Sequence, residues 1–259
     1  MLIESKNEYI PSLTRLWNVV FGDSDDYIDL FFHKAYYDCE CFAELDGDKI
    51  ISAFYLLKSS IRVDGKTYNG RYLYAAATLP EYRGKGLMSK LINEAVAYGE
   101  KEKLDFIALV PANDGLYDYY GRFGFKESMY KYMAEISLRL KDCSPIADAE
   151  NFGKIRNTSG CNMMVYNKIG TEYAFDCLKF SGADVLAVSD SVYYINDEEL
   201  FVSGDCLYPA DIFGESNEDR LTVYTNYPFE NAVKVRNGMI YNFRNDIEFK
   251  DIYMNIALD

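Results

Sequence analysis

A short basic loop in the N-terminal half carries the residues best suited to chemistry. Arg83, Lys85 and Lys90 lie in a stretch without acids, in a chain whose formal net charge is −14. Gly84 and Gly86 alternate with these cations, and glycine lets backbone N–H groups approach an anion closely. A helical apolar pattern follows, and the N-terminus of a helix attracts negative charge. The loop is therefore predicted to bind phosphate.

The sequence argues against two common kinds of phosphate loop. It contains no GxxxxGK[ST] motif, and the GxGxxG spacing of dinucleotide sites is broken because Ser89 stands at the last glycine position. Nucleotide hydrolysis is therefore disfavoured.

Hydrophobic periodicity predicts the elements that must position the loop. Helical spacing favours helices over 8–21, 24–37, 88–99, 116–123 and 171–181. Runs typical of strands cover 2–4, 41–45, 50–63, 71–78, 106–110, 130–140, 192–195, 200–203, 221–225, 239–243 and 252–258. The loop is thus predicted to join a strand to a helix.

Length and composition indicate a globular α/β protein. The 259 residues are 49% hydrophobic, which suffices for one large domain or two smaller ones. The polar stretch after Leu140 breaks the pattern and predicts a domain boundary within 141–151. The six cysteines form no CxxC pair, and His33 is the only histidine, so neither a zinc site nor a Cys/His nucleophile is expected. We therefore expect reduced thiols and no metal.

The acidic charge bears on partners and location. An acidic surface repels nucleic acid, so no nucleic-acid partner is expected. No run of 18 apolar residues and no charged-then-apolar leader are evident, which favours a cytoplasmic protein without a membrane partner. Most of the negative charge lies after Leu140. The excess serves solubility on one interpretation, and on another it attracts a cationic substrate.

The strand ending ATLPEY, the loop RGKGLM, the strand FIALVPAN and the segment NDGLYDYYGRFGF together resemble the GNAT acyl-CoA N-acyltransferases. The resemblance covers about the first 140 residues. The family signature, Arg or Gln, two residues, Gly, one residue, then Gly or Ala, falls on Arg83, Gly86 and Met88. Met88 departs from it, and a methionine directed to the core face of the helix would leave the turn open.

The resemblance implies acetyl-CoA as co-substrate. The diphosphate and 3′-phosphate of coenzyme A are bound favourably by backbone N–H donors at a helix N-terminus and by nearby cations. In the family, the strand before the loop splays from its neighbour and leaves backbone groups free for the pantetheine. The cofactor-binding residues implied are Thr78, Leu79, Arg83, Gly84, Lys85, Gly86, Leu87, Met88 and Asn113. Asn113 would bond near the pantetheine or order the short helix that follows it.

Tyr120 matches the family's tyrosine that protonates the departing thiolate. As an amine attacks the thioester, negative charge moves to sulfur, and a phenol held close can donate a proton. A packing role is the alternative, since the chain has 24 tyrosines and Tyr120 lies on the apolar stripe. Tyr117 and Tyr119 are lesser candidates for the same role.

The general base is not evident, because the strand over 72–78 carries no carboxylate. Eis-like two-module relatives place the C-terminal carboxylate in the active site. Asp259 follows an apolar run, so it is a candidate base, with an ordinary terminal strand as the alternative.

These observations predict two modules. Residues 1–140 form a GNAT catalytic domain with a mixed, mostly antiparallel sheet, and residues 150–259 form an α+β module that looks like a degenerate GNAT repeat, with a sterol-carrier-like module as runner-up. The expected function is acetyl transfer from acetyl-CoA to a primary amine, borne by a small molecule or peptide of cationic character. A non-catalytic acyl-CoA sensor or scaffold is the alternative, and both the acceptor and a homo-oligomeric state stay open.

Overall fold

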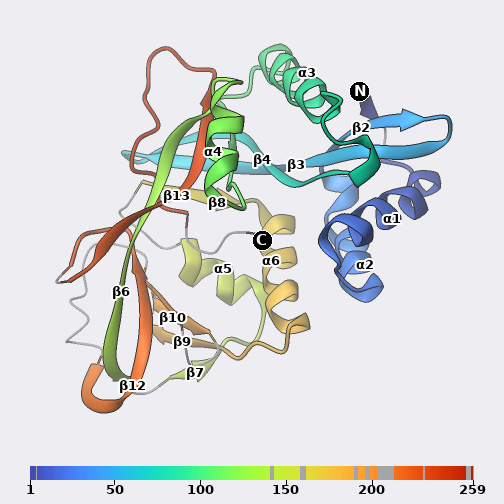
Figure 1. The fold of residues 1–259 in the computed structure, drawn as a ribbon. Helices are drawn as coiled ribbons and strands as arrows, with labels where there is room; N and C mark the ends of the chain where they lie inside the picture. Colours follow the sequence, from blue (N-terminus) through green and yellow to red (C-terminus); the bar gives the residue numbers. More distant parts are fainter. Residues whose placement is uncertain are drawn as a thin grey trace.

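The computed structural model describes residues 1–3, 5–140, 143–157, 162–189, 192–195, 199–202, 213–229, 231–254 and 258 (Figure 1). Its α-helices are α1 (Ile10–Phe21), α2 (Asp25–Lys34), α3 (Leu87–Lys101), α4 (Asp114–Gly121), α5 (Ala149–Asn157) and α6 (Lys168–Phe180). Its strands are β1 (Leu2–Ile3), β2 (Glu40–Asp46), β3 (Lys49–Val63), β4 (Lys66–Thr78), β5 (Phe106–Leu109), β6 (Lys126–Leu140), β7 (Ser144–Pro145), β8 (Met163–Tyr166), β9 (Val185–Ser189), β10 (Val192–Ile195), β11 (Glu199–Val202), β12 (Phe213–Thr225) and β13 (Val233–Asn242).

The described strands join in one sheet of 13 strands. Their order is β1-β2-β3-β4-β5-β13-β6-β12-β11-β10-β9-β7, with β8 beside β3. Within this described sheet, β4–β5 and β11–β12 pair in parallel and the other pairs are antiparallel. The prediction of an α/β fold with a mixed, mostly antiparallel sheet is confirmed.

The sheet runs through both halves of the chain. Strand β13, from the C-terminal half, lies between β5 and β6, where Met239 pairs with Leu109 and Ile240 with Lys126. Strand β8 likewise pairs with β3, with Val165 opposite Ser60. The division into domains 1–140 and 150–259 stays a prediction, and four described strand pairings cross it: β8 with β3, β13 with β5, β13 with β6, and β12 with β6.

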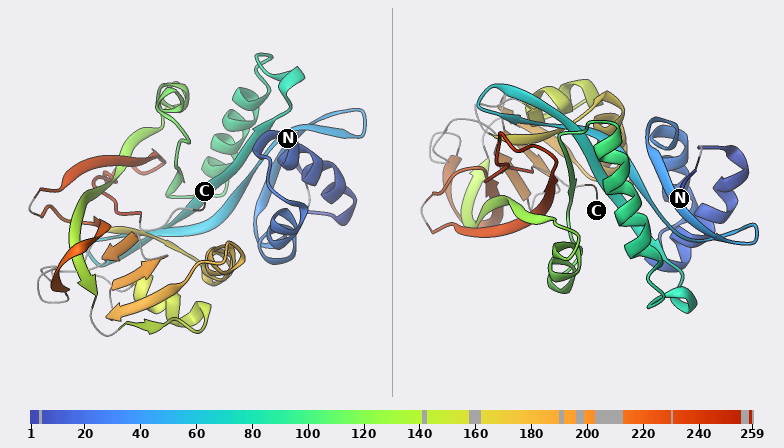
Figure 2. Two further views of the ribbon diagram at one scale, coloured as in Figure 1. Left: turned by 60° about the horizontal axis from the view of Figure 1, so that its bottom comes forward. Right: turned by 90° about the horizontal axis from the view of Figure 1, so that it is seen from above.

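Two layers of helices cover opposite faces of the sheet, as Figure 2 shows for α3 against α1 and α2. Side chains of α1, α2 and α6 pack in one apolar cluster, and side chains of α3 and α4 pack in a second. Strand β3 serves both, because successive side chains point to opposite faces. Tyr55 and Leu57 enter the first cluster, whereas Phe54 and Leu56 enter the second.

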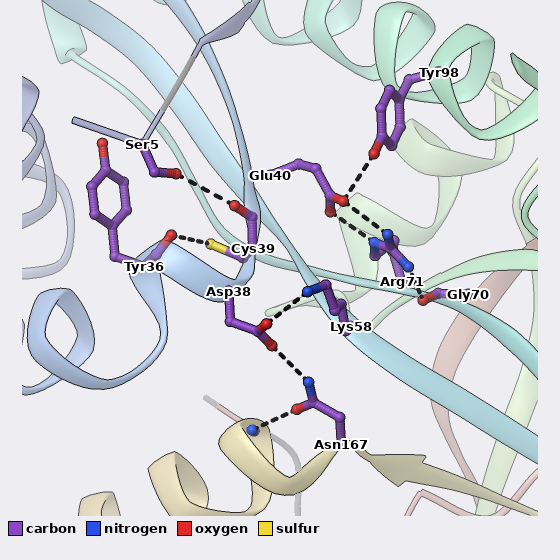
Figure 3. A network of polar contacts seen from close by, with 11 residues as sticks. Ser5, Tyr36, Asp38, Cys39, Glu40, Lys58, Gly70, Arg71, Tyr98 and Asn167 are labelled. Atoms are coloured by element: carbon purple, nitrogen blue, oxygen red, sulfur yellow. Dashed lines mark hydrogen bonds and ion pairs between the residues drawn. The ribbon is translucent and has the colours of Figure 1, made fainter. Parts of the chain in front are cut away.

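A polar network joins the C-terminal half to the first strands (Figure 3). The Asp38 carboxylate accepts from Lys58 Nζ at 2.6 Å and from Asn167 Nδ2 at 2.7 Å. Asn167 also caps α6, since its Oδ1 accepts from the backbone N–H of Gly170 at 2.7 Å. Nearby, Arg71 of β4 donates two bonds to Glu40 of β2, at 2.7 and 2.8 Å. The bonds to Asp38 link the start of α6 to β3, and the bonds from Arg71 link β4 to β2.

Four described elements of the second half were not expected from the sequence. Strand β7 and the start of helix α5 lie inside the stretch where a domain boundary was predicted, and β8 and β9 were not predicted at all. In the terminal run 252–258, the described residues Ile252 and Tyr253 make single bridges to Met129 and Met163. No helix of the described chain is long and apolar enough to cross a membrane.

Candidate active site

The predicted phosphate loop connects the end of β4 to the start of α3. A 3-10 turn, Pro80–Tyr82, leads out of the strand, and Gly86 is the N-cap of the helix. Gly84 and Gly86 have φ angles of 74° and 77°, in the left-handed region that favours glycine. A Cβ at either position would meet nothing within 4 Å, so the backbone angle and not crowding requires glycine. The first N–H groups of α3 have no partner within the helix and are suited to an anion.

The cations of the loop fall into two groups. Arg83 donates from Nε to the carbonyl of Thr78, at the end of β4, at 3.1 Å. Lys85 Nζ lies 4.5 Å from the ring centre of Tyr82. Lys90 instead pairs with Glu44 at 2.8 Å. Arg83 and Lys85 are exposed and make no ion pair with a residue that the structure describes. Their charges are the ones available to a phosphate.

Leu87 and Met88 begin α3 and are both half-buried. Leu87 packs against the first apolar cluster, and Met88 packs against the second, below α3 and α4. Met88 is the departure from the family signature. Because its side chain lies against the core, it does not fill the turn between the two glycines.

Strands β4 and β5 pair over a short stretch and then separate. Residues 70–72 pair in parallel with 106–108, and β4 continues alone on that side to Thr78. Within the separated part, Ala75 has a φ of 51°, and the β3–β4 register shifts between Tyr74 and Ala77. This is a β-bulge, which bends the strand locally and breaks its ladder. The edge of β4 toward β5 is therefore open next to the loop.

The two residues assigned to the pantetheine differ in their bonding. The N–H of Leu79 donates to the carbonyl of Ile51 at 3.0 Å, so the backbone of Leu79 faces β3. Because successive residues of a strand face opposite edges, the backbone of Thr78 faces the open edge. The Thr78 hydroxyl bonds to that of Ser52 at 2.7 Å. Of this pair, Thr78 is the residue whose backbone lies along the open edge.

A cavity of about 500 Å³ occupies the space where the strands separate. It is lined by Trp17, Phe21, Asp23, Tyr72, Leu73, Tyr74, Ala75, Ala76, Leu109, Val110, Pro111, Ala112, Leu116, Tyr120 and Leu258. These residues come from α1, β4, the end of β5 and α4. The size is typical of a small-molecule site.

Helix α4 carries the candidate acids, and the structure separates them. Tyr120 lines the cavity and is only 6% exposed. Tyr117 is buried beneath the guanidinium of Arg236, whose carbon lies 4.0 Å from the ring centre. The hydroxyl of Tyr119 bonds to that of Ser89 at 3.1 Å. Tyr120 is thus the one tyrosine of α4 in the described cavity wall.

Burial raises the pKa of Tyr120. Desolvation, with a smaller contribution from Tyr119, raises the pKa of the Tyr120 phenol well above its usual range. The ring also packs edge-on against Phe125, at 5.9 Å between centres. The packing role and the cavity position therefore coexist, and the phenol is protonated at physiological pH.

Asn113 is the N-cap residue of α4, but its side chain makes no capping hydrogen bond. Its backbone carbonyl accepts the N–H of Leu116 at 3.1 Å. The side chain is exposed at the end of β5. It therefore does not order the helix and is open to a ligand.

Asp23 is a site residue that the sequence reasoning missed. It joins Gly22, which ends α1 with a φ of 79°, to Ser24, which caps α2. Its Oδ2 accepts from the indole Nε1 of Trp17 at 2.8 Å. Helix-stop and helix-cap signals account for Gly22 and Ser24, and nothing in the local pattern shows that Asp23 lines a cavity together with residues of β4 and α4.

The end of the chain also reaches the cavity. Leu258 lines it, and the hydroxyl of Tyr72 donates to the Leu258 carbonyl at 3.4 Å. Asp259, the predicted base, lies outside the described residues. Its role stays a prediction.

Comparisons with known proteins bear on the family and the fold of the chain. Residues 2–128 match the family model of the acetyltransferase (GNAT) domain. None of the curated proteins matches the sequence. The resemblance expected from the loop is confirmed by the family model.

Solved structures of the same kind cover 93% of this chain. One is a conserved protein of Enterococcus faecalis V583 described as "Probable N-Acyltransferase", with a TM-score of 0.69, 12% identity and 72% of its own length covered. A GCN5-related N-acetyltransferase of Kribbella flavida has a TM-score of 0.65, 14% identity and 71% covered. Eis1 of Mycobacterium abscessus has a TM-score of 0.64, 10% identity and 72% covered. At these identities the likeness shows the fold.

Proposed function

Because residues 2–128 belong to the GNAT acetyltransferases, which move an acyl group from acyl-CoA to an amine, we propose that this protein acetylates a primary amine by direct attack on acetyl-CoA. The observation that carries the proposal is the cavity at the separation of β4 and β5, with a protonated tyrosine in its wall. The phosphate loop lies at the end of the same strand.

The cofactor end of the site is built from the loop and β4. Backbone N–H groups at the start of α3 and the side chains of Arg83 and Lys85 bind the phosphates. The pantetheine lies along the open edge of β4, where Thr78 offers its backbone N–H, since its carbonyl accepts from Arg83, and Asn113 approaches it from beyond the end of β5. The acetyl thioester is thereby brought into the cavity.

The proton steps use residues in the cavity wall. The bound ammonium first loses a proton to the candidate base, and the resulting neutral amine attacks the thioester carbonyl. The C–S bond breaks as Tyr120 donates a proton to the departing thiolate, and the proton released from the acylated nitrogen returns Tyr120 to its neutral form. Asp23 draws the ammonium form of the acceptor to the cavity through its carboxylate. Asp259 is retained as the candidate base, adjacent to Leu258. Full activity in a variant that lacks Asp259 would remove it from the mechanism.

Tyr120→Phe tests the general acid, with Tyr117→Phe as a matched control on the same helix. Loss of the proton donor is expected to lower kcat by about 10²-fold. The KM for acetyl-CoA should change little, because the phenyl ring keeps its packing. Tyr117→Phe removes a buried phenol that does not line the cavity and should keep kcat within about twofold of the parent.

The pH profile strengthens this test. Since burial raises the pKa of Tyr120, the acid stays protonated through the ordinary phenol range, and its ionisation should cause no fall in kcat below about pH 10. Steady-state thiol release from pH 6 to 10 measures it. An unchanged kcat in Tyr120→Phe would rule out Tyr120 as the general acid. Acetyl-CoA binding without turnover of any amine would instead favour a non-catalytic acyl-CoA sensor.

A further inference from the structure

The cavity wall combines five aromatic residues with a single charge. Trp17, Phe21, Tyr72, Tyr74 and Tyr120 supply the rings, and Asp23 is the one charged residue among the described residues of the lining. The other lining residues are aliphatic or small. Such a wall favours a ligand with a large apolar surface and few polar groups.

Most of these rings are held in place before any ligand binds. Trp17 packs edge-on against Tyr74, with 5.6 Å between ring centres and 70° between planes. It makes a similar contact with Phe21, at 6.0 Å and 69°. The hydroxyl of Tyr74 bonds to that of Tyr173 at 3.0 Å, and Tyr173 is fully buried. Rings fixed in this way lose little conformational freedom when a ligand binds.

The charge is fixed as well. Trp17 binds one oxygen of Asp23 at 2.8 Å and so orients the carboxylate next to the rings. One carboxylate neutralises one ammonium group. Within the described lining, a second ammonium would lie against aliphatic walls, where an unpaired charge is strongly unfavourable. The candidate base Asp259 is not counted as its partner, because a base must be free to accept the amine proton. Aromatic faces beside the carboxylate further favour a single cation.

We propose that the acceptor is a small primary amine with one positive charge and an aromatic body, bound with its ammonium toward Asp23 and its ring against Trp17 and Phe21. This rests on the proposed acetyl transfer and names the acceptor class for that site. Polyamines and aminoglycosides, which carry several charges, fit the wall poorly.

Three matched amines test the proposal with the full chain at saturating acetyl-CoA. 2-Phenylethylamine carries the ring, butylamine has the same charge without it, and 1,4-diaminobutane adds a second charge to butylamine. Ring burial should give 2-phenylethylamine a kcat/KM at least about tenfold above butylamine. The diamine should fall below butylamine. Thiol release measures the rate, and mass spectrometry identifies the acetylated product.

Phe21→Ala links the preference to the cavity wall, with Phe180→Ala as its control. The two phenylalanines are similarly exposed, 45% and 48%, but only Phe21 lines the cavity. Because both side chains are largely exposed, the variants should fold. Phe21→Ala should lower kcat/KM for 2-phenylethylamine about tenfold and leave that for butylamine within about twofold. Phe180→Ala should change neither.

The outcomes distinguish failure of the aromatic-acceptor proposal from failure of the proposed acetyl transfer. Faster turnover of the diamine than of 2-phenylethylamine, or an equal loss on both monoamines in Phe21→Ala, would overturn the aromatic acceptor and keep the acetyltransferase. Turnover of polyamines or peptides without turnover of aromatic amines would do the same. Failure of every amine, with acetyl-CoA bound, would overturn acetyl transfer itself.

Discussion

Gly86 shows that the backbone decides which residue the phosphate loop accepts at the helix start. Its φ of 77° is unfavourable for a residue with a Cβ, although the space around it is open. The sequence allowed this prediction, because a glycine between cations and before a helix points to a positive φ. What the sequence could not supply was the partner of each cation.

Gly86→Ala is expected to lower the free energy of unfolding by about 1–2 kcal/mol, because alanine is strained at this φ. It should also weaken acetyl-CoA binding, since the strained loop would shift its N–H groups. Thermal or urea unfolding and calorimetric titration with acetyl-CoA measure the two effects.

Gly121→Ala is the matched control for Gly86→Ala. Gly121 closes α4, its φ is not in the left-handed region, and a Cβ there also meets open space. Alanine should therefore be neutral or stabilising by about 0.5–1 kcal/mol. Similar losses in both variants would contradict the argument from the backbone angle.

Lys90 and Asp23 mark the limit of sequence reasoning at the residue scale. Lys90 belongs to the basic stretch, yet it pairs with Glu44 of β2, which lies far away in the sequence. Asp23 sits in a turn, and its meeting with β4 and α4 depends on how α1 packs under the sheet. Local pattern identifies the loop residues, whereas these two contacts arise from tertiary packing.

At the scale of elements, α6 depends on one residue with two functions. Asn167 caps the helix through Oδ1 and donates through Nδ2 to Asp38, in the N-terminal half. Helix α6 in turn carries Tyr173, which holds the cavity ring of Tyr74. The bond to Asp38 therefore bears on the position of the cavity wall.

Asn167→Ala is expected to lower the free energy of unfolding by about 2 kcal/mol, because it removes a cap and a cross-link together. Ser24→Ala, which removes the cap of α2 alone, should cost about 1 kcal/mol. Urea unfolding followed by circular dichroism compares them. A loss in Asn167→Ala no greater than that in Ser24→Ala would mean that the bond to Asp38 adds nothing.

Elements with strong local signals were predictable, and elements made by distant pairing were not. The apolar stripe of α3 is visible in the sequence as helical spacing, and the buried strand β5 is visible as a short continuous apolar run. Strand β8 is only four residues long and exists because it pairs with β3. Helix α5 begins in a polar stretch and buries few apolar side chains, so its pattern resembles a linker.

At the scale of the whole molecule, β13 makes the two halves interdependent. It pairs with β5 on one side and with β6 on the other. A chain of residues 1–140 would therefore leave both strands without the partner between them. The proposed division into domains implies that residues 1–140 fold on their own, and the position of β13 argues against this.

A fragment of residues 1–140 is expected to lack a cooperative unfolding transition, because open strand edges and exposed core surface would remain on β5 and β6. Urea unfolding of the fragment beside the full chain, and amide dispersion in its NMR spectrum, are the measurements. A sharp transition with native-like dispersion would show instead that the N-terminal half folds alone.

The position of β13 in the sheet also affects the order in which the sheet can form during synthesis. A chain emerging from the ribosome makes β4, the basic loop and α4 first, yet β13, which lies between β5 and β6, appears only after residues 122–232 have been made. Until then the β5 edge is open to other chains, and long-range pairing of this kind forms slowly. The proposed acetyl-CoA site should therefore become competent to bind only after β13 has been made, and so later than the residues proposed to form it.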